Sequence, residues 1–260
     1  MKPLQETAES FYTAFYEKKW APTQGAISVD TLTVEEAYCV QDLVTKKRLL
    51  SGESIVGYKV GCTSKAIRTQ FNLNEPIHAK LFKPRIYSEN ATMNLNDYVD
   101  CAIEPEMVLK IGKDLIGENL PDEVLRDAIE YVSPGIELHN YRFWNQPPTI
   151  QELICSGGIH AGMVIGNEKV IPSSLTFADE VFRVYKNNSL MTSASAVEIM
   201  GGPMYSLRWL VSSLTMKGLT LKEGSIVIPG SPTELVNIEG RTDLKISIDH
   251  VGSVKALFDN

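Results

Sequence analysis

The sequence predicts an α+β protein in which a mostly helical N-terminal region precedes a β-rich domain. Two long segments before residue 51 carry apolar side chains at helical spacing. From about residue 82, short strand-like runs alternate with turn residues instead. The chain of 260 residues contains no internal repeat and no low-complexity segment. We therefore expect a helical region over 1–81 and a β-rich domain over 82–260.

The N-terminal region is expected to begin with two amphipathic helices. Apolar residues recur at helical spacing over 4–19, which predicts the first helix. The second helix should begin near Thr33, where T-V-E-E has the pattern of a capping box. It should end at about Leu50, because Ser51-Gly52 follows.

The next stretch, 55–62, is strand-like and places Lys59 between Gly57 and Gly61. Glycines within a strand often mark the close approach of another backbone or of a ligand. A short helix is expected over 65–71, after which the chain should run as a loop up to Leu81.

The β-rich domain is expected to contain short strands interrupted by two helices, at 121–131 and 203–217. The Asn187-Asn188 pair is a hairpin turn signal. The predicted strands cover 84–88, 101–110, 133–139, 160–166, 180–186, 190–193, 225–229, 244–249 and 252–258.

Composition restricts the function classes. Apolar residues make up 43% and charged residues 22%, as in soluble globular proteins. A net charge of −7 without a basic block argues against nucleic acid as a partner. The sequence contains no run of about 18 apolar residues, so we expect no membrane-spanning helix. The four cysteines form no C-x-x-C pair, so we expect them to be free, reduced and mostly buried in a cytoplasmic protein.

The chemistry is expected to centre on Glu104 and Glu106 in an otherwise apolar run. In a strand, side chains at i and i+2 share a face, which places these carboxylates about 7 Å apart. A hard divalent cation such as Mg²⁺ or Mn²⁺ would relieve their repulsion. The alternative is an ordinary solvated acidic face. Pro105 between them predicts an irregular or edge strand.

Seven short motifs follow one another along nearly the whole chain. They are G-Y-K-V-G-C-T-S (57–64), I-E-P-E-M-V-L-K-I (103–111), P-G-I-E-L-H-N-Y-R (134–142), G-M-V-I-G (162–166), G-G-P-M-Y-S-L-R-W-L (201–210), L-K-E-G-S-I-V-I-P-G-S (221–231) and H-V-G-S-V-K-A-L-F (250–258). In this order the chain resembles the fumarylacetoacetate hydrolase superfamily. Within it, the resemblance is to the branch of 2-keto-4-pentenoate hydratases and 2-oxo-hexenedioate (4-oxalocrotonate) decarboxylases.

The resemblance implies a mixed, rolled β-sheet that holds a divalent ion, and a homo-oligomer. Its three acidic ligands map onto Glu104, Glu106 and Glu137, with Mg²⁺ or Mn²⁺ as the cofactor. Lys59 matches the lysine of the family's G-Y-K-x-G motif. It is expected to pair with a substrate carboxylate or to act as a general acid or base. The alternative, which would be preferred if the motif were absent, is a surface lysine whose ammonium group lies in solvent.

Three further residues are candidates for substrate contacts. Arg142 matches the arginine of the family's E-x-x-x-x-R pattern, and we expect it to brace Glu137 or its loop. Ser231 ends a Pro-Gly-Ser turn that resembles one lining the family's pocket, with an ordinary turn serine as the alternative. Ser156 is the one serine kept where the family tends to show Asp-Asn-Ala-Ser.

The chain also departs from the family beside the lysine. The hydratases are expected to carry an acidic residue in a P-D-F-G-x-L loop, and this chain reads P-I-H-A-K-L over 76–81. His78 is a candidate substitute acid or base, since imidazole titrates near neutrality, and an exposed loop histidine is the alternative. The predicted metal site is kept, whereas the residues around the substrate differ.

The resemblance implies a divalent-metal-dependent hydratase that adds water to a short unsaturated 2-keto acid through a stabilised enolate. Decarboxylation of a 2-oxo-hexenedioate is the alternative within the same chemistry. A hydrolase of acylpyruvate C–C bonds fits less well. Such hydrolases resemble enzymes that use a His-Glu pair to activate water, and His78 is the only histidine in the N-terminal half of this sequence. A further alternative is a catalytically weak homologue that binds metal or keto acid, which the missing acidic residue in 76–81 favours.

Overall fold

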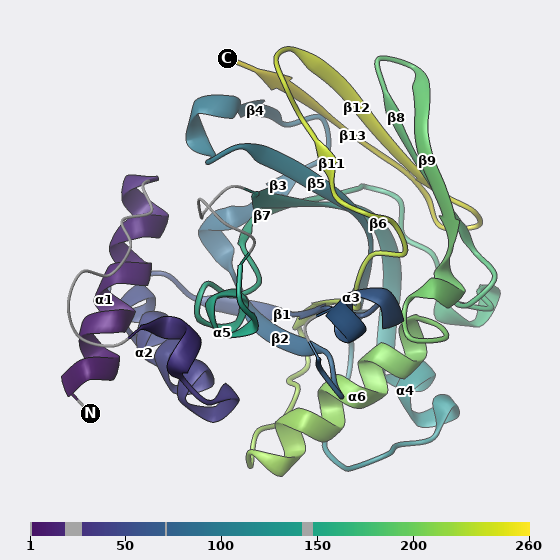
Figure 1. Cartoon of the computed structure of the whole chain (residues 1–260). Helices are drawn as coiled ribbons and strands as arrows, with labels where there is room; N and C mark the ends of the chain where they lie inside the picture. Colours follow the sequence, from purple (N-terminus) through teal and green to yellow (C-terminus); the bar gives the residue numbers. More distant parts are fainter. Residues whose placement is uncertain (1, 19–27, 71, 142–147) are drawn as a thin grey trace.

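The computed structural model describes residues 2–18, 28–70, 72–141 and 148–260. Two β-sheets form the body of the protein, and helices cover the larger one (Figure 1). Sheet A has the strand order β2-β1-β10-β5-β6-β7-β3, with β11 also pairing with β5, and sheet B has the order β4-β13-β12-β8-β9.

Sheet A consists of β1 (Ile55–Gly61), β2 (Ile77–Phe82), β3 (Ile86–Ser88), β5 (Cys101–Ile111), β6 (Ile129–Asn140), β7 (His160–Ile165), β10 (Ile226–Ile228) and β11 (Val236–Asn237). It mixes parallel and antiparallel pairs: β1 runs parallel to β10, and the long strands β5 and β6 are antiparallel. The sheet curls on itself, so that β1 and β2 lie across from β7 (Figure 1). Sheet A contains strands from both sides of residue 81.

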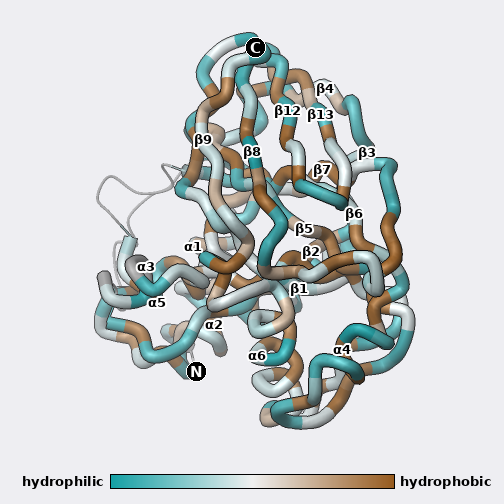
Figure 2. Tube along the Cα trace, turned by 90° about the vertical axis from the view of Figure 1, so that its right-hand side faces the viewer, coloured by the Kyte–Doolittle hydropathy of each residue, from teal (hydrophilic) through white to brown (hydrophobic). Residues whose placement is uncertain are grey.

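Sheet B consists of β4 (Thr92–Asn94), β8 (Val181–Lys186), β9 (Ser189–Ser195), β12 (Thr242–Ile248) and β13 (Gly252–Asp259). Strands β8, β12 and β13 alternate buried side chains with more exposed ones, and hydrophobic and hydrophilic residues follow one another along them (Figure 2). The buried side of β12 and β13 joins one core with the apolar residues of β5 and β6. The predicted hairpin at Asn187-Asn188 is confirmed, since both residues have positive φ between β8 and β9.

The helices are α1 (Lys2–Glu17), α2 (Val34–Leu50), α3 (Lys65–Gln70), α4 (Asp122–Ala128), α5 (Ile150–Cys155) and α6 (Pro203–Met216). Helices α1, α2 and α5 share a second core with Ile77 of β2. The predicted capping box is confirmed: Thr33 accepts from the backbone of Glu36, whose carboxylate accepts from the backbone of Thr33.

Gly57 shows why β1 carries a glycine. A Cβ at this position would lie 1.8 Å from the carbonyl oxygen of Ile226 on β10, which is far inside van der Waals contact. Only glycine lets these two parallel strands approach at this point. The approach brings Lys59 next to Ile228, the last residue of β10.

The structure corrects three secondary-structure predictions. The segment expected to be a loop up to Leu81 contains β2, which pairs along its length with β1; polar side chains at His78 and Lys80 had concealed it. The helix predicted over 121–131 ends at Ala128, because the following β-branched run enters β6. Helix α5 was missed, although Thr149 and Glu152 form a capping box at its start.

Pro105, predicted to mark an irregular or edge strand, lies in β5, which is not an edge strand because it runs inside sheet A between β6 and β10. Strand β10 pairs with Leu109 and Lys110, and β11 pairs with Ala102 and Ile103. Pro105 falls between these two partners, which is how an interior strand accommodates a residue without a backbone N–H.

Two further expectations concern the chain as a whole. None of the helices in the described ranges is long and apolar enough to cross a membrane. The four cysteines are free, as predicted. Cys101 and Cys155 are buried, Cys62 is half-buried and Cys39 is exposed, so burial is less general than expected.

Candidate active site

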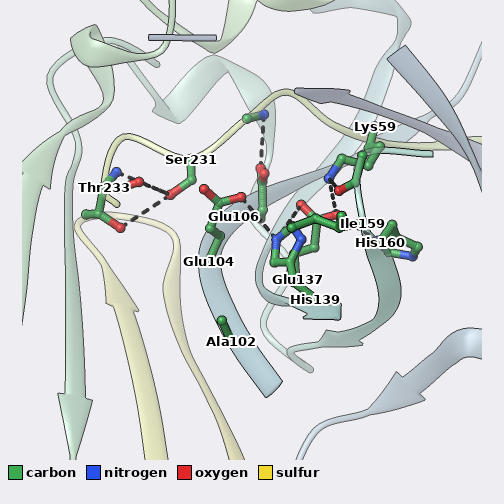
Figure 3. A network of polar contacts seen from close by, with 12 residues as sticks. Lys59, Ala102, Glu104, Glu106, Glu137, His139, Ile159, His160, Ser231 and Thr233 are labelled. Atoms are coloured by element: carbon green, nitrogen blue, oxygen red, sulfur yellow. Dashed lines mark hydrogen bonds and ion pairs between the residues drawn. The ribbon is translucent and has the colours of Figure 1, made fainter. Parts of the chain in front are cut away.

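The acidic residues meet on one face of the β5–β6 pair. The register places Glu104 directly opposite Glu137, and Glu106 opposite Gly135. Residues that face each other across an antiparallel pair point to the same side, as do residues two apart along one strand. The three carboxylates predicted as metal ligands therefore share one surface of the sheet (Figure 3). Glu106 and Glu137 are fully buried, and Glu104 is partly exposed.

Lys59 reaches this surface from across the curl of the sheet. Its Nζ donates to Glu137 Oε1 at 2.5 Å and to the carbonyl oxygen of Gly158 at 3.3 Å (Figure 3). Gly158 has φ +69°, and a Cβ there would press on the Lys59 side chain at 3.3 Å. Glycine at this turn thus provides both the backbone conformation and the space for the lysine.

The buried charges shift one another's pKa values. Burial by itself would lower the pKa of Lys59, but the charges of Glu137, Glu104 and Glu106 outweigh it and raise the pKa. For Glu137, burial opposes the charged form, yet Lys59 and the neighbouring histidines hold its pKa below the ordinary value. Burial and the two other carboxylates raise the pKa of Glu106 well above its usual range. The site thus contains two more carboxylates than its one lysine can neutralise.

Two histidines flank Glu137. His160 at the start of β7 places Nδ1 2.7 Å from Glu137 Oε1, and burial lowers the pKa of this imidazole to about 4. His139 lies two residues after Glu137 on β6 and therefore on the same face. Its Nε2 is 3.1 Å from Glu104 Oε2 and 3.5 Å from Glu137 Oε2 (Figure 3).

These side chains have the properties of a divalent-metal site. One ligand atom each from Glu104, Glu137 and His139 fall within 4.8 Å of one another. Among the described residues, no hydrogen-bond partner is found for Glu106 Oε1, Glu137 Oε2 or either ring nitrogen of His139, although all are buried. Buried polar atoms are normally satisfied, so a cation among them would explain the arrangement.

Comparisons with known proteins agree with the motifs and with this geometry. No protein-family model matches the sequence. Curated relatives match over most of their length: the chain is 24% identical to the 2-keto-4-pentenoate hydratase of Paraburkholderia xenovorans over 263 residues, covering 100% of this chain and 97% of the relative. It is 28% identical to the TodF product hydratase of Pseudomonas putida, covering 86% and 84%.

Solved structures show the same architecture. The 4-oxalocrotonate decarboxylase of Pseudomonas putida G7, complexed with magnesium and adipate, superposes with a TM-score of 0.92 at 21% identity, covering 99% of this chain and 97% of that one. The fumarylacetoacetate hydrolase of Exiguobacterium antarcticum gives a TM-score of 0.63 at 14% identity, covering 79% and 75%. The chain therefore has the fold of the fumarylacetoacetate hydrolases. The fold prediction of a rolled sheet with N-terminal helices is thereby confirmed. As the motifs predicted, the sequence is similar to hydratases of the 2-keto-4-pentenoate type over most of its length.

His78, the candidate acid or base, does not join these side chains. It pairs with Val60, so its side chain points to the face of the sheet opposite Lys59. There its ring stacks on Tyr38 at 4.9 Å, and its Nε2 lies 3.0 Å from Lys217 Nζ. Burial and the charge of Lys217 lower its pKa to about 3, which makes the imidazole a neutral packing group.

Of the three candidates for substrate contacts, the structure places Ser231 near the carboxylates and Ser156 in the turn that ends α5. Ser231 follows Gly230, whose N–H donates to Glu106 Oε2 at 3.1 Å, and its hydroxyl accepts from the backbone of Thr233 near the carboxylates (Figure 3). The hydroxyl of Ser156 donates to the carbonyl oxygen of Leu153 in the turn that ends α5. Arg142 lies outside the described residues.

The sequence analysis overlooked His139, His160 and Gly158. Strand periodicity provided a signal for His139, because a residue two positions after Glu137 shares its face. His160 had no such signal, since its approach to Glu137 depends on the pairing of β6 with β7. Gly158 stood in a run of small residues, and its role appears only once Lys59 is placed beside it.

Because the raised pKa of Glu106 makes its ionised form costly in the absence of a cation, Glu106→Gln is expected to stabilise the metal-free protein. A carboxyl whose folded-state pKa is raised contributes stability at low pH and loses it as pH rises through that pKa. In EDTA at pH 8, urea titrations should therefore show a gain of about 0.5–2 kcal/mol for the variant.

The gain should shrink as pH falls toward 4.5, the ordinary pKa of the group. Glu118→Gln, at an exposed position, is the matched control and should show no gain. A metal-free variant that is less stable than the parent at pH 8 would contradict the electrostatic account.

Proposed function

We propose that this protein is a divalent-metal-dependent hydratase, a lyase that adds water to a short 2-hydroxy-dienoate or unsaturated 2-keto acid of the 2-keto-4-pentenoate type. The similarity to hydratases over most of the chain supports the reaction class. The observation that carries the proposal is the buried surface on which Glu104, Glu106 and Glu137 converge with Lys59. Three carboxylates and one lysine suit a substrate that is itself an anion with adjacent oxygens.

Glu104, Glu106 and Glu137 would hold the ion, and Mg²⁺ or Mn²⁺ bound there would supply Lewis-acid polarisation of the 2-oxo group. The Mg²⁺ complex of the similar decarboxylase supports this assignment. A fumarylpyruvate hydrolase from Pseudomonas aeruginosa, solved with Mn²⁺ and pyruvate, supports it as well. That structure has a TM-score of 0.61 at 14% identity, and the match covers 78% of this chain and 88% of that one.

Lys59 is the residue of this chain best placed to handle a proton. Its ammonium is buried, and Glu137 and the carbonyl of Gly158 direct it toward the carboxylate surface. From there Nζ can donate a hydrogen bond to a substrate carboxylate, or deliver a proton to carbon when the enol form is converted to the keto form. The neutral ring of His160 contacts the same oxygen, Glu137 Oε1, and helps to hold the carboxylate in place, so the lysine keeps an oriented partner.

Decarboxylation of a 2-oxo-hexenedioate is the second candidate. It is favoured by the close superposition on the 4-oxalocrotonate decarboxylase, at a TM-score of 0.92. The same lysine and carboxylates would serve that reaction, because an enolate forms there too. A third candidate, a catalytically weak homologue that binds metal or keto acid, follows from the missing acidic residue in 76–81.

The deciding assay follows loss of the absorbance of 2-hydroxypenta-2,4-dienoate in the presence of Mg²⁺ or Mn²⁺. We expect turnover that disappears with EDTA and returns when the ion is restored in excess. CO₂ release from 2-oxohex-3-enedioate without hydration of the dienoate would instead establish the decarboxylase. Metal binding without turnover of either substrate would favour the third candidate, a catalytically weak homologue that binds metal or keto acid.

A further inference from the structure

His139 has a place at the metal site that the three carboxylates alone do not explain. It stands opposite Ala102 on β5, so a small residue leaves the space its ring occupies. The residue is 2% exposed, and its Nε2 points between Glu104 and Glu137 at 3.1 and 3.5 Å (Figure 3). The ring is therefore aimed at the carboxylate surface and not at solvent.

Hydrogen bonding does not account for this position. Neither ring nitrogen of His139 has a hydrogen-bond partner among the described residues, and Glu137 Oε2 is unpartnered as well. An Nε2–H could donate to only one of the two carboxylates, and an Nε2 lone pair would repel both. An unsatisfied buried polar group costs about 1–3 kcal/mol, so leaving these atoms unpaired would be unfavourable.

A single cation would satisfy the imidazole and both carboxylates. Neighbouring donors in an octahedral shell with bonds of about 2.1 Å lie about 3 Å apart. The separations from Nε2 to the two carboxylate oxygens are close to this value, and the three donors all lie within 4.8 Å of one another. The donor set is thus mixed, with nitrogen beside oxygen.

We propose that His139 is a nitrogen ligand of the divalent ion and that it makes the site prefer Mn²⁺ to Mg²⁺. Mg²⁺ favours an all-oxygen shell, whereas Mn²⁺, which also suits carboxylates, belongs to the first-row transition series and accepts an imidazole nitrogen more readily. The inference rests on the divalent ion of the proposed function and adds to it the identity of one ligand and the preference among ions. It needs no assumption about the substrate.

The test combines calorimetry with pulsed electron paramagnetic resonance on the full chain. Mn²⁺ bound to the parent protein should show ¹⁴N modulation from one coordinated imidazole, and His139→Gln should lack it. The variant should bind Mn²⁺ about tenfold more weakly or worse, with a change of less than about threefold for Mg²⁺. Circular dichroism and urea titration verify that the variant folds.

Two matched variants keep the outcome specific. His160→Gln and His250→Gln, which change a histidine beside Glu137 and an exposed one, should both retain the ¹⁴N modulation. Mn²⁺ binding without ¹⁴N modulation in the parent, or modulation that persists in His139→Gln, would overturn the ligand assignment while leaving the carboxylate site intact. Absence of any Mn²⁺ binding by the parent would overturn both this inference and the divalent-ion part of the proposed function.

Discussion

Glu137→Ala is expected to lower the free energy of unfolding by about 3–5 kcal/mol and to abolish divalent-ion binding. The first effect arises because Lys59 loses the carboxylate with which it forms a buried ion pair at 2.5 Å. His160 loses its partner at Nδ1 through the same substitution. The second effect arises because Glu137 lies at the centre of the acidic surface, opposite Glu104 and two residues from His139. Urea denaturation and Mn²⁺ titration measure the two effects separately.

The matched control is the double variant Lys59→Met, Glu137→Met. Replacing both members of a buried ion pair with apolar residues of similar size is often tolerated, so the double variant should recover much of the lost stability while still failing to bind the ion. A double variant as unstable as Glu137→Ala would show that the loss came from packing. Since the pKa of Glu137 is held below its ordinary value of 4.5, the parent's advantage should also fade as pH drops below that value.

Lys59→Met is expected to reduce kcat by about 10²–10⁴-fold, the usual contribution of a positioned general acid or base. Mn²⁺ affinity should stay within about threefold of the parent, because the ammonium carries the same sign of charge as the ion and donates no lone pair. Progress curves on the dienoate and calorimetric titration of Mn²⁺ provide the two measurements. Added ethylamine should restore part of the activity to Lys59→Ala if the amine acts chemically.

Lys80→Met is the matched control, because Lys80 lies on the neighbouring strand with its side chain on the opposite face and pairs with Asp42. It should retain parental kcat. If metal binding and activity collapse together in Lys59→Met, the lysine is structural and not catalytic.

Local patterns in the sequence were sufficient for many of the elements and for part of the site. Apolar periodicity and the capping box at Thr33 predicted α1 and α2, since both signals act within a few residues. Period two placed Glu104 and Glu106 on one face before any partner strand was known. Local pattern failed at β2, where polar residues hide a strand whose partner β1 supplies its hydrogen bonds.

The sequence by itself determined the acidic pair on β5, the lysine between its glycines and, through the order of motifs, the resemblance to the fumarylacetoacetate hydrolase superfamily. Only the tertiary structure decided what surrounds them: Glu137 opposite Glu104, Lys59 across the curl of the sheet, His139 aimed at both carboxylates, and His78 turned away to the other face. The reason is that strand register and sheet curl join residues far apart in sequence, such as Lys59 and Glu137, which are 78 positions apart. No local propensity encodes such a pairing, because it forms only when the core of sheet A is packed.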